Sequence, residues 1–223
     1  MSQVDSEEKK IEGDVENIID ENRVVNFSDA VFAFAATLLV LKIDIPQINS
    51  GFVETQLITS LVNLWPQYFA NIISFLIIGY YWLTHHMVFG LLRKFNRTVV
   101  WMNIVFLILV SFIPFPVDLY GDFNNVPAVV VFYSASLALV GYMLAIIWWY
   151  ASANNRLISP EMTKRKISFI TAKILVAPVV FTLSMPLVYF HPIMAQASWV
   201  LIILGVFMIN KKFHYKSSTD TGV

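Results

Sequence analysis

Cysteine is absent from the chain, which excludes disulfide bonds and any metal or redox site built on thiolates. Charge is scarce too. Only 13% of the residues are charged, and 15 basic side chains balance 15 acidic ones, so nucleic acid is not an expected partner. The first 22 residues are acidic and contain no apolar run, so they do not predict a signal peptide. Hydrophobic side chains make up 57% of the chain, and the mean hydropathy is +0.67. These values are typical of a polytopic membrane protein.

Six apolar segments are predicted to cross the bilayer, whose hydrocarbon core is ~30 Å thick and takes about 20 helical residues. They cover residues 24–41, 57–92, 98–113, 126–153, 167–190 and 193–209. The second is too long for one perpendicular crossing, and Trp65-Pro66 is predicted to begin its membrane part or to kink it. Pro114 is predicted to end the third span before a loop over residues 117–125. The predicted fold class is all-α, with a six-helix transmembrane domain over residues 23–210 between polar tails over 1–22 and 211–223.

Lysine and arginine set the expected orientation, because short cytoplasmic segments of membrane proteins carry an excess of these residues. With the N-terminus in the cytosol, thirteen Lys and Arg residues fall in cytosolic segments, and among the outer loops only Lys42 is basic. The sequence therefore predicts a cell-membrane protein with both tails in the cytosol. The N-terminal tail is expected either to be a solvated, disordered segment or to extend the first helix, since Ile11, Val15 and Ile18 recur at helical spacing.

The first span, which follows Arg23, has two different sides. At ~100° per residue, Phe27, Phe34 and Leu41 fall on one line along the helix. The residues beside that line are Ala30, Val31, Thr37 and Leu38. Asp29 lies on another side, among small residues that favour close helix packing. An apolar stripe alone is typical of core or lipid-facing packing, whereas an ionisable residue within a span indicates a functional site by default.

Four polar side chains are predicted to share one depth in the membrane. Counting ~1.5 Å per residue from the cytosolic ends of the first three spans places Asp29 and Asn103 ~9 Å deep and His85 ~10–12 Å deep, with Ser28 at the same level. Polar groups at that depth lack bulk water and must form hydrogen bonds with one another. Two interpretations stay open: a hydrogen-bonded clamp that holds the first helix in register, or a proton relay or ion site. Trp82 shares a face of the second span with His85.

The start of the first span resembles the signature of the transmembrane protein 175 family, the endolysosomal and bacterial potassium channels. The matching residues are Arg23-x-x-x-Phe27-Ser28-Asp29 and the Ala- and Leu-rich run after them. Further family features are Trp82, His85 and Phe89 on the second span, and Asn103 and Pro114-Phe115 on the third. The resemblance covers the whole chain. Because a single six-span unit resembles the bacterial members, it implies a homotetramer in the lipid bilayer, with potassium as the permeant ion and no cofactor.

The resemblance also implies which residues would form the pore. In this family, the first helix of each subunit lines the pore, and bulky apolar side chains make its constriction. Carried over by position, the constriction is Phe34, with Leu38 and Leu41 as further layers and Thr37 as the candidate selectivity residue. The constriction position is usually isoleucine or leucine, so phenylalanine implies a tighter or differently gated ring. The Thr-Val-Gly-Tyr-Gly filter is absent from the family and from this sequence.

Two other functions compete with a potassium leak channel. A proton-coupled or cation secondary transporter would use Asp29 and His85, but transporters typically show inverted repeats and broken helices, and neither is clear here. An intramembrane enzyme would need a nucleophile–base pair or a metal cluster. His85 and its neighbour His86 diverge by ~100° on a helix, so they could not hold one metal. The sequence favours a channel and predicts no enzyme.

Overall fold

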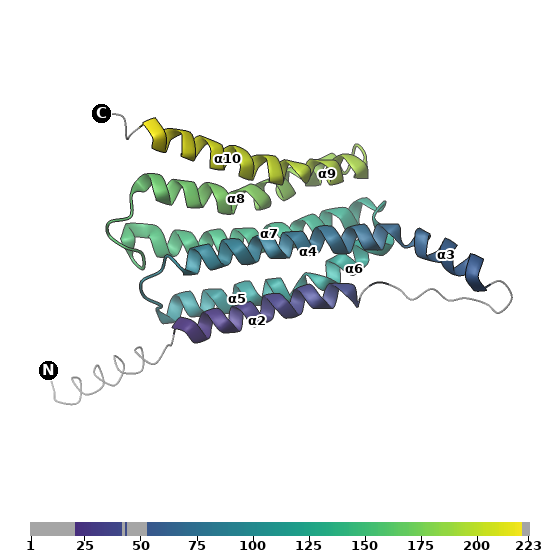
Figure 1. Cartoon of the computed structure of the whole chain (residues 1–223), viewed down its shortest axis with the longest axis horizontal. Coiled ribbons are helices and arrows are strands. Elements are labelled where there is room, and N and C mark those ends of the chain that lie inside the picture. The colour runs from purple at the N-terminus through teal and green to yellow at the C-terminus, as the bar shows by residue number, and fades with distance from the viewer. Residues whose placement is uncertain (1–20, 42, 44–52, 220–223) are drawn as a thin grey trace.

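The computed structural model of the chain describes residues 21–41, 43 and 53–219, and Figure 1 shows their arrangement. Nearly all of the predicted tail over residues 1–22 lies outside the described residues. Among the described residues, six helical segments are long and apolar enough to cross a membrane, which confirms the all-α, six-span prediction. The helices are α2 Glu21–Val40, α3 Val53–Asn63, α4 Trp65–Phe89, α5 Arg97–Phe112, α6 Pro114–Phe123, α7 Pro127–Ser152, η1 Ala153–Asn155, α8 Lys164–Leu187, α9 Pro192–Ser198 and α10 Val200–Thr219.

The prediction that Pro114 ends the third span is wrong. Helix α5 ends at Phe112, and α6 begins two residues later at Pro114 itself, so one apolar segment runs from Arg97 to Phe123. Ile113 keeps helical backbone angles, with φ −52° and ψ −40°. Proline is tolerated in the first turn of a helix because its missing N–H would have no intrahelical partner there. The predicted loop over residues 117–125 is therefore helical as far as Phe123.

The second and sixth spans are each divided. Leu64 separates α3 from α4, so Trp65-Pro66 begins the membrane helix, as predicted. Helix α3 extends beyond the end of the bundle (Figure 1). Trp199 separates α9 from α10, and α10 continues to Thr219, past the predicted end of the span at residue 209.

The helices pack so that α2 lies at one edge of the bundle and α10 at the opposite edge (Figure 1). Helix α2 packs on α4 and α5, while α10 packs mainly on α8. Between them, α7 and α8 approach closely where Gly141 faces Pro178. A Cβ added at Gly141 would lie 2.8 Å from the Pro178 ring, so only glycine permits this approach. Because α2 is an edge helix, its own chain covers only part of its surface.

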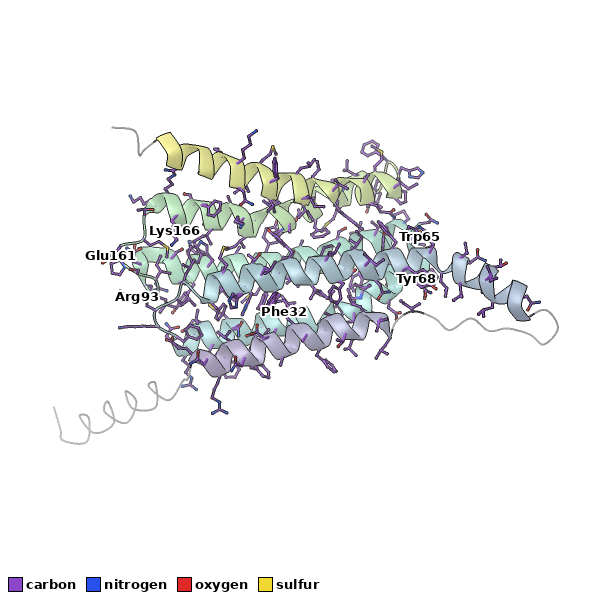
Figure 2. The ribbon with its side chains drawn as sticks, in the orientation of Figure 1. Phe32, Trp65, Tyr68, Arg93, Glu161 and Lys166 are labelled. Carbon is purple, nitrogen blue, oxygen red and sulfur yellow. The ribbon has the colours of Figure 1, made fainter. Side chains whose placement is uncertain are left out.

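Two basic loops meet at the end of the bundle where α2 begins. The Arg93 N–H donates to the Leu157 carbonyl at 2.8 Å, and Leu92 and Ile158 form an antiparallel bridge. Figure 2 shows Arg93 and Lys166 at this end, and Trp65 at the other. The loops after α4 and after α7 thus lie on the same side of the bundle, as a count of six spans requires.

Candidate functional site

Helix α2 buries one side and leaves another uncovered. The buried side consists of Ser28, Phe32, Ala35 and Leu39. Phe32 lies between α2 and the rest of the bundle (Figure 2), where its ring contacts those of His85 and Phe106. This side carries the interactions that hold α2 in place.

The uncovered side is the predicted stripe of bulky apolar residues. The exposed fractions are 59% for Phe27, 64% for Phe34 and 75% for Leu41. Leu38 is half-buried at the margin of the stripe. Lipid or another chain must cover the stripe, because apolar area left in water would cost ~25 cal/mol per Å².

Thr37 is the exposed hydroxyl of this stripe. Its Oγ1 donates to the Phe34 carbonyl at 2.9 Å, one turn earlier on the same helix. This bond uses the hydroxyl proton, so the oxygen keeps lone pairs that can accept from water or coordinate a cation. The arrangement therefore presents an acceptor on the uncovered side of α2.

A buried chain of hydrogen bonds joins α2, α5 and α4. The Asn103 amide Nδ2 donates to Ser28 Oγ at 2.9 Å, and Ser28 Oγ donates to the Val24 carbonyl at 2.9 Å. Asn103 Oδ1 lies 2.9 Å from His85 Nε2. Since the amide oxygen can only accept, His85 carries its proton on Nε2. The structure thus joins three of the four residues that were predicted to share one depth.

His85 is enclosed by aromatic rings. Its ring stacks on Phe89 at a centroid distance of 4.1 Å and on Phe106 at 5.3 Å. The side chain is fully buried, and Nδ1 has no hydrogen-bond partner among the described residues. A proton passing through this ring would need a second partner, which the described surroundings of Nδ1 do not supply. The buried His85 ring is therefore suited to holding helices in position, and not to transferring a proton.

Asp29, the fourth residue, does not join this chain. Its Oδ1 instead accepts a 2.8 Å hydrogen bond from the Trp82 indole Nε1. Asp29 is half-buried and Trp82 is exposed at the side of α4. The prediction that all four polar side chains would form hydrogen bonds with one another is therefore only partly right. Two separate polar contacts connect α2 to its neighbours.

Other predicted residues occupy simpler positions. Arg23 is exposed in the first turn of α2. His86 is exposed and Trp82 packs against its ring, while His85 is buried, so the two histidines point apart as predicted. Within the described ranges, no group of three or more His, Cys, Asp or Glu side chains could hold a metal ion.

Sequence reasoning missed two contributions to the site. Phe106 stacks on His85, and its position one turn after Asn103 on the same helix was the available signal. Gln67 Nε2 donates to Asp122 Oδ1 at 2.8 Å, which ties α4 to α6. That contact could not be foreseen, because residues 117–125 were expected to form a loop.

The fold and site define a polytopic α-helical membrane protein whose first described helix, α2, lies at an edge of the bundle and carries an uncovered apolar stripe. The sequence model of one family, described as "Endosomal/lysosomal potassium channel TMEM175", matches residues 23–114. A potassium channel of Chamaesiphon minutus is 36% identical over 156 residues, which cover 67% of this chain and 74% of that protein. The chain belongs to the TMEM175 family, which is a family of ion channels and not of enzymes.

Other relatives agree with this assignment. A potassium channel of Streptomyces collinus is 31% identical over 149 residues, covering 64% of this chain and 70% of that protein. The human endosomal/lysosomal proton channel TMEM175 is 26% identical over 150 residues, covering 67% of this chain and 29% of that protein. Among solved structures, the lysosomal potassium-selective channel TMEM175 homolog from Chamaesiphon minutus superposes with a TM-score of 0.73 at 28% identity. That match covers 85% of this chain and 98% of the other.

Proposed function

We propose that this chain is a subunit of a potassium-selective leak channel that conducts passively through a pore lined by α2. The observation that carries the proposal is the uncovered stripe of α2, which is opposite the side packed into its own bundle. The names of the bacterial relatives and of the similar solved structure support potassium as the permeant ion.

The pore would lie on the symmetry axis of a homotetramer. One copy supplies one α2, and a single stripe cannot enclose a path for ions. Closed cyclic symmetry places the same face of every subunit around a common axis. Four stripes facing that axis would cover the exposed rings of Phe27 and Phe34 without lipid.

Within this pore, Phe34 would form the constriction. Hydrophobic constrictions gate by dewetting, because a narrow apolar ring disfavours water and the ions it hydrates. Leu38 and Leu41 would form further apolar layers towards the outer side. Thr37 would add four hydroxyl oxygens next to the constriction, each with lone pairs left by its bond to the Phe34 carbonyl.

The two polar contacts of α2 would act as a clamp. The Ser28–Asn103–His85 chain and the Asp29–Trp82 bond fix the rotation of α2 about its own axis, and so decide which side faces the pore. A proton-coupled carrier using Asp29 and His85 is less well supported. The two residues bond to different partners, and aromatic rings enclose His85.

The protein would lie in the cell membrane with both termini in the cytosol. The basic loops after α4 and α7 lie at the end where α2 begins, which supports this orientation under the rule for Lys and Arg. The six-helix domain would cover residues 23–210, between cytosolic tails over residues 1–22 and 211–223.

Ion flux from liposomes containing the purified protein tests the proposal. Potassium efflux down its gradient, faster than sodium efflux and insensitive to the proton gradient, is the expected result. Potassium movement against its gradient, driven by a proton or sodium gradient, would instead identify a carrier.

A further inference from the structure

A groove lies between α4 and α10, with α8 at its floor. Its cavity volume is 380 Å³, which falls within the range of small-molecule sites. Leu76 on α4 and Ile203 on α10 form exposed walls, and Ala177 of α8 is fully buried at its floor. The groove is therefore open to its surroundings and closed underneath.

The lining is mostly apolar, and its few polar side chains form hydrogen bonds within the chain. Its polar side chains all donate to groups of the chain itself: Tyr80 to the Lys173 carbonyl, Trp199 to Ser184 Oγ, and Gln196 to the Asn124 carbonyl. The remaining lining residues are apolar. This lining suits a ligand that binds through apolar contacts and not through hydrogen bonds.

The length of the groove matches one leaflet of the membrane. Phe69 and Tyr80 mark its extent along α4 and stand eleven residues apart, or ~16 Å. Half of a ~30 Å hydrocarbon core is ~15 Å. Phe69 is four residues from the start of α4 at Trp65, so the groove begins near that end of the bundle and runs inwards.

The close packing of α10 on α8 keeps the α10 wall of the groove apart from the α4 wall. A Cβ added at Gly205 would lie 2.9 Å from Val176 Cγ1, so glycine lets α10 lie close against α8 at this point. Helix α10 is fixed to α8 in this way, and the space between α10 and α4 remains open.

We propose that this groove holds an acyl chain of a phospholipid from the leaflet at the Trp65 end of the bundle. The choice of lipid over a second copy rests on the proposed function, in which the stripes of α2 face the tetramer axis and the groove between α4 and α10 faces the bilayer. Lipid in this position supports α10, whose apolar span is mostly left uncovered by the described part of the chain.

Native mass spectrometry of the detergent-purified protein tests the inference. We expect the wild-type protein to retain a single phospholipid per chain through detergent exchange. Ile203→Trp places an indole in the groove and should abolish retention. Leu204→Trp is the matched control, because Leu204 is exposed on the same helix but does not line the groove. This variant should retain the lipid.

Equal retention in both variants, or no retained lipid in the wild type, would overturn the inference. Ile203→Cys distinguishes the competing occupant. The chain has no cysteine of its own, so disulfide-linked dimers of this variant in membranes would show that the grooves of two copies face each other. None of these readings requires ion flux, so a failed lipid site and a failed channel assignment give different results.

Discussion

Asn103 Nδ2 donates a 2.9 Å hydrogen bond to Ser28 Oγ, joining α5 to α2 across 75 residues of sequence, with both side chains buried. The same amide accepts from His85 on α4. One side chain therefore sets the positions of three helices. The proposed pore depends on it indirectly, since rotating α2 would turn its apolar stripe away from the axis.

Replacing Asn103 with leucine should destabilise the protein and its assembly. The change leaves the buried His85 Nε2–H without an acceptor and removes the donor to Ser28, at a cost of ~1–3 kcal/mol. Thermal unfolding and size-exclusion chromatography measure the loss. Ser111→Ala is the control, because Ser111 is exposed and bonds only to its own helix, so it should behave as wild type. If Asn103→Leu were as stable as the wild type, the hydrogen bonds of Asn103 to Ser28 and His85 would not be what positions α2.

Substitutions at Asp29 separate a clamp from an ion pathway. Asp29→Asn keeps an oxygen that can accept from the Trp82 indole but removes the charge. We expect it to assemble and conduct as wild type does, whereas Asp29→Ala should assemble poorly. The measurement is the tetramer fraction together with the potassium-to-sodium flux ratio. A well-assembled Asp29→Asn variant with an altered ratio would place Asp29 in the pathway.

Counting residues along each helix correctly placed Ser28, Asn103 and His85 at one level, because rise per residue fixes the height of a side chain in a helix. It could not pair Asp29 with Trp82, since that contact depends on how each helix is rotated about its axis. The failure at Pro114 has a different cause. Proline interrupts a helix interior but fits a first turn, and the sequence does not say which of these it occupies. Whether lipid or other copies cover α2 is set by contacts outside the chain.

Thr37→Val should reduce the preference for potassium over sodium and leave the fold intact. The substitution keeps the shape of the side chain and deletes its oxygen. Thr37→Ser is the matched control and should retain most of the preference. Bi-ionic potentials of reconstituted channels give the ratio. Unchanged selectivity in Thr37→Val would remove this hydroxyl from the selectivity mechanism.

Phe34→Ala should raise potassium flux, because a wider opening relieves the dewetting barrier of a phenylalanine ring. Stopped-flow efflux from liposomes measures the rate. Ile108→Ala provides the comparison, since Ile108 is an exposed apolar residue on α5, and it should leave the rate unchanged. Equal rates in the two variants would assign Phe34 to the lipid-facing surface.

A reporter fused after Val223 tests the orientation. Because the loops after α4 and α7 are basic and lie at one end of the bundle, we expect a fused reporter to be protected from external protease in intact cells. Cleavage of the reporter in intact cells would show that the C-terminus lies outside. The order of the pore layers from cytosol to outside would then also be the reverse of the one proposed.

The central claim is that α2 lines the pore, and thiol block of Phe34→Cys tests it most directly. The native chain has no cysteine, so a charged thiol reagent can react only at the introduced site. Potassium flux through Phe34→Cys should stop after treatment, whereas Ile108→Cys, at an exposed apolar position of α5, should keep its flux. Continued flux through fully labelled Phe34→Cys would contradict a pore lined by α2.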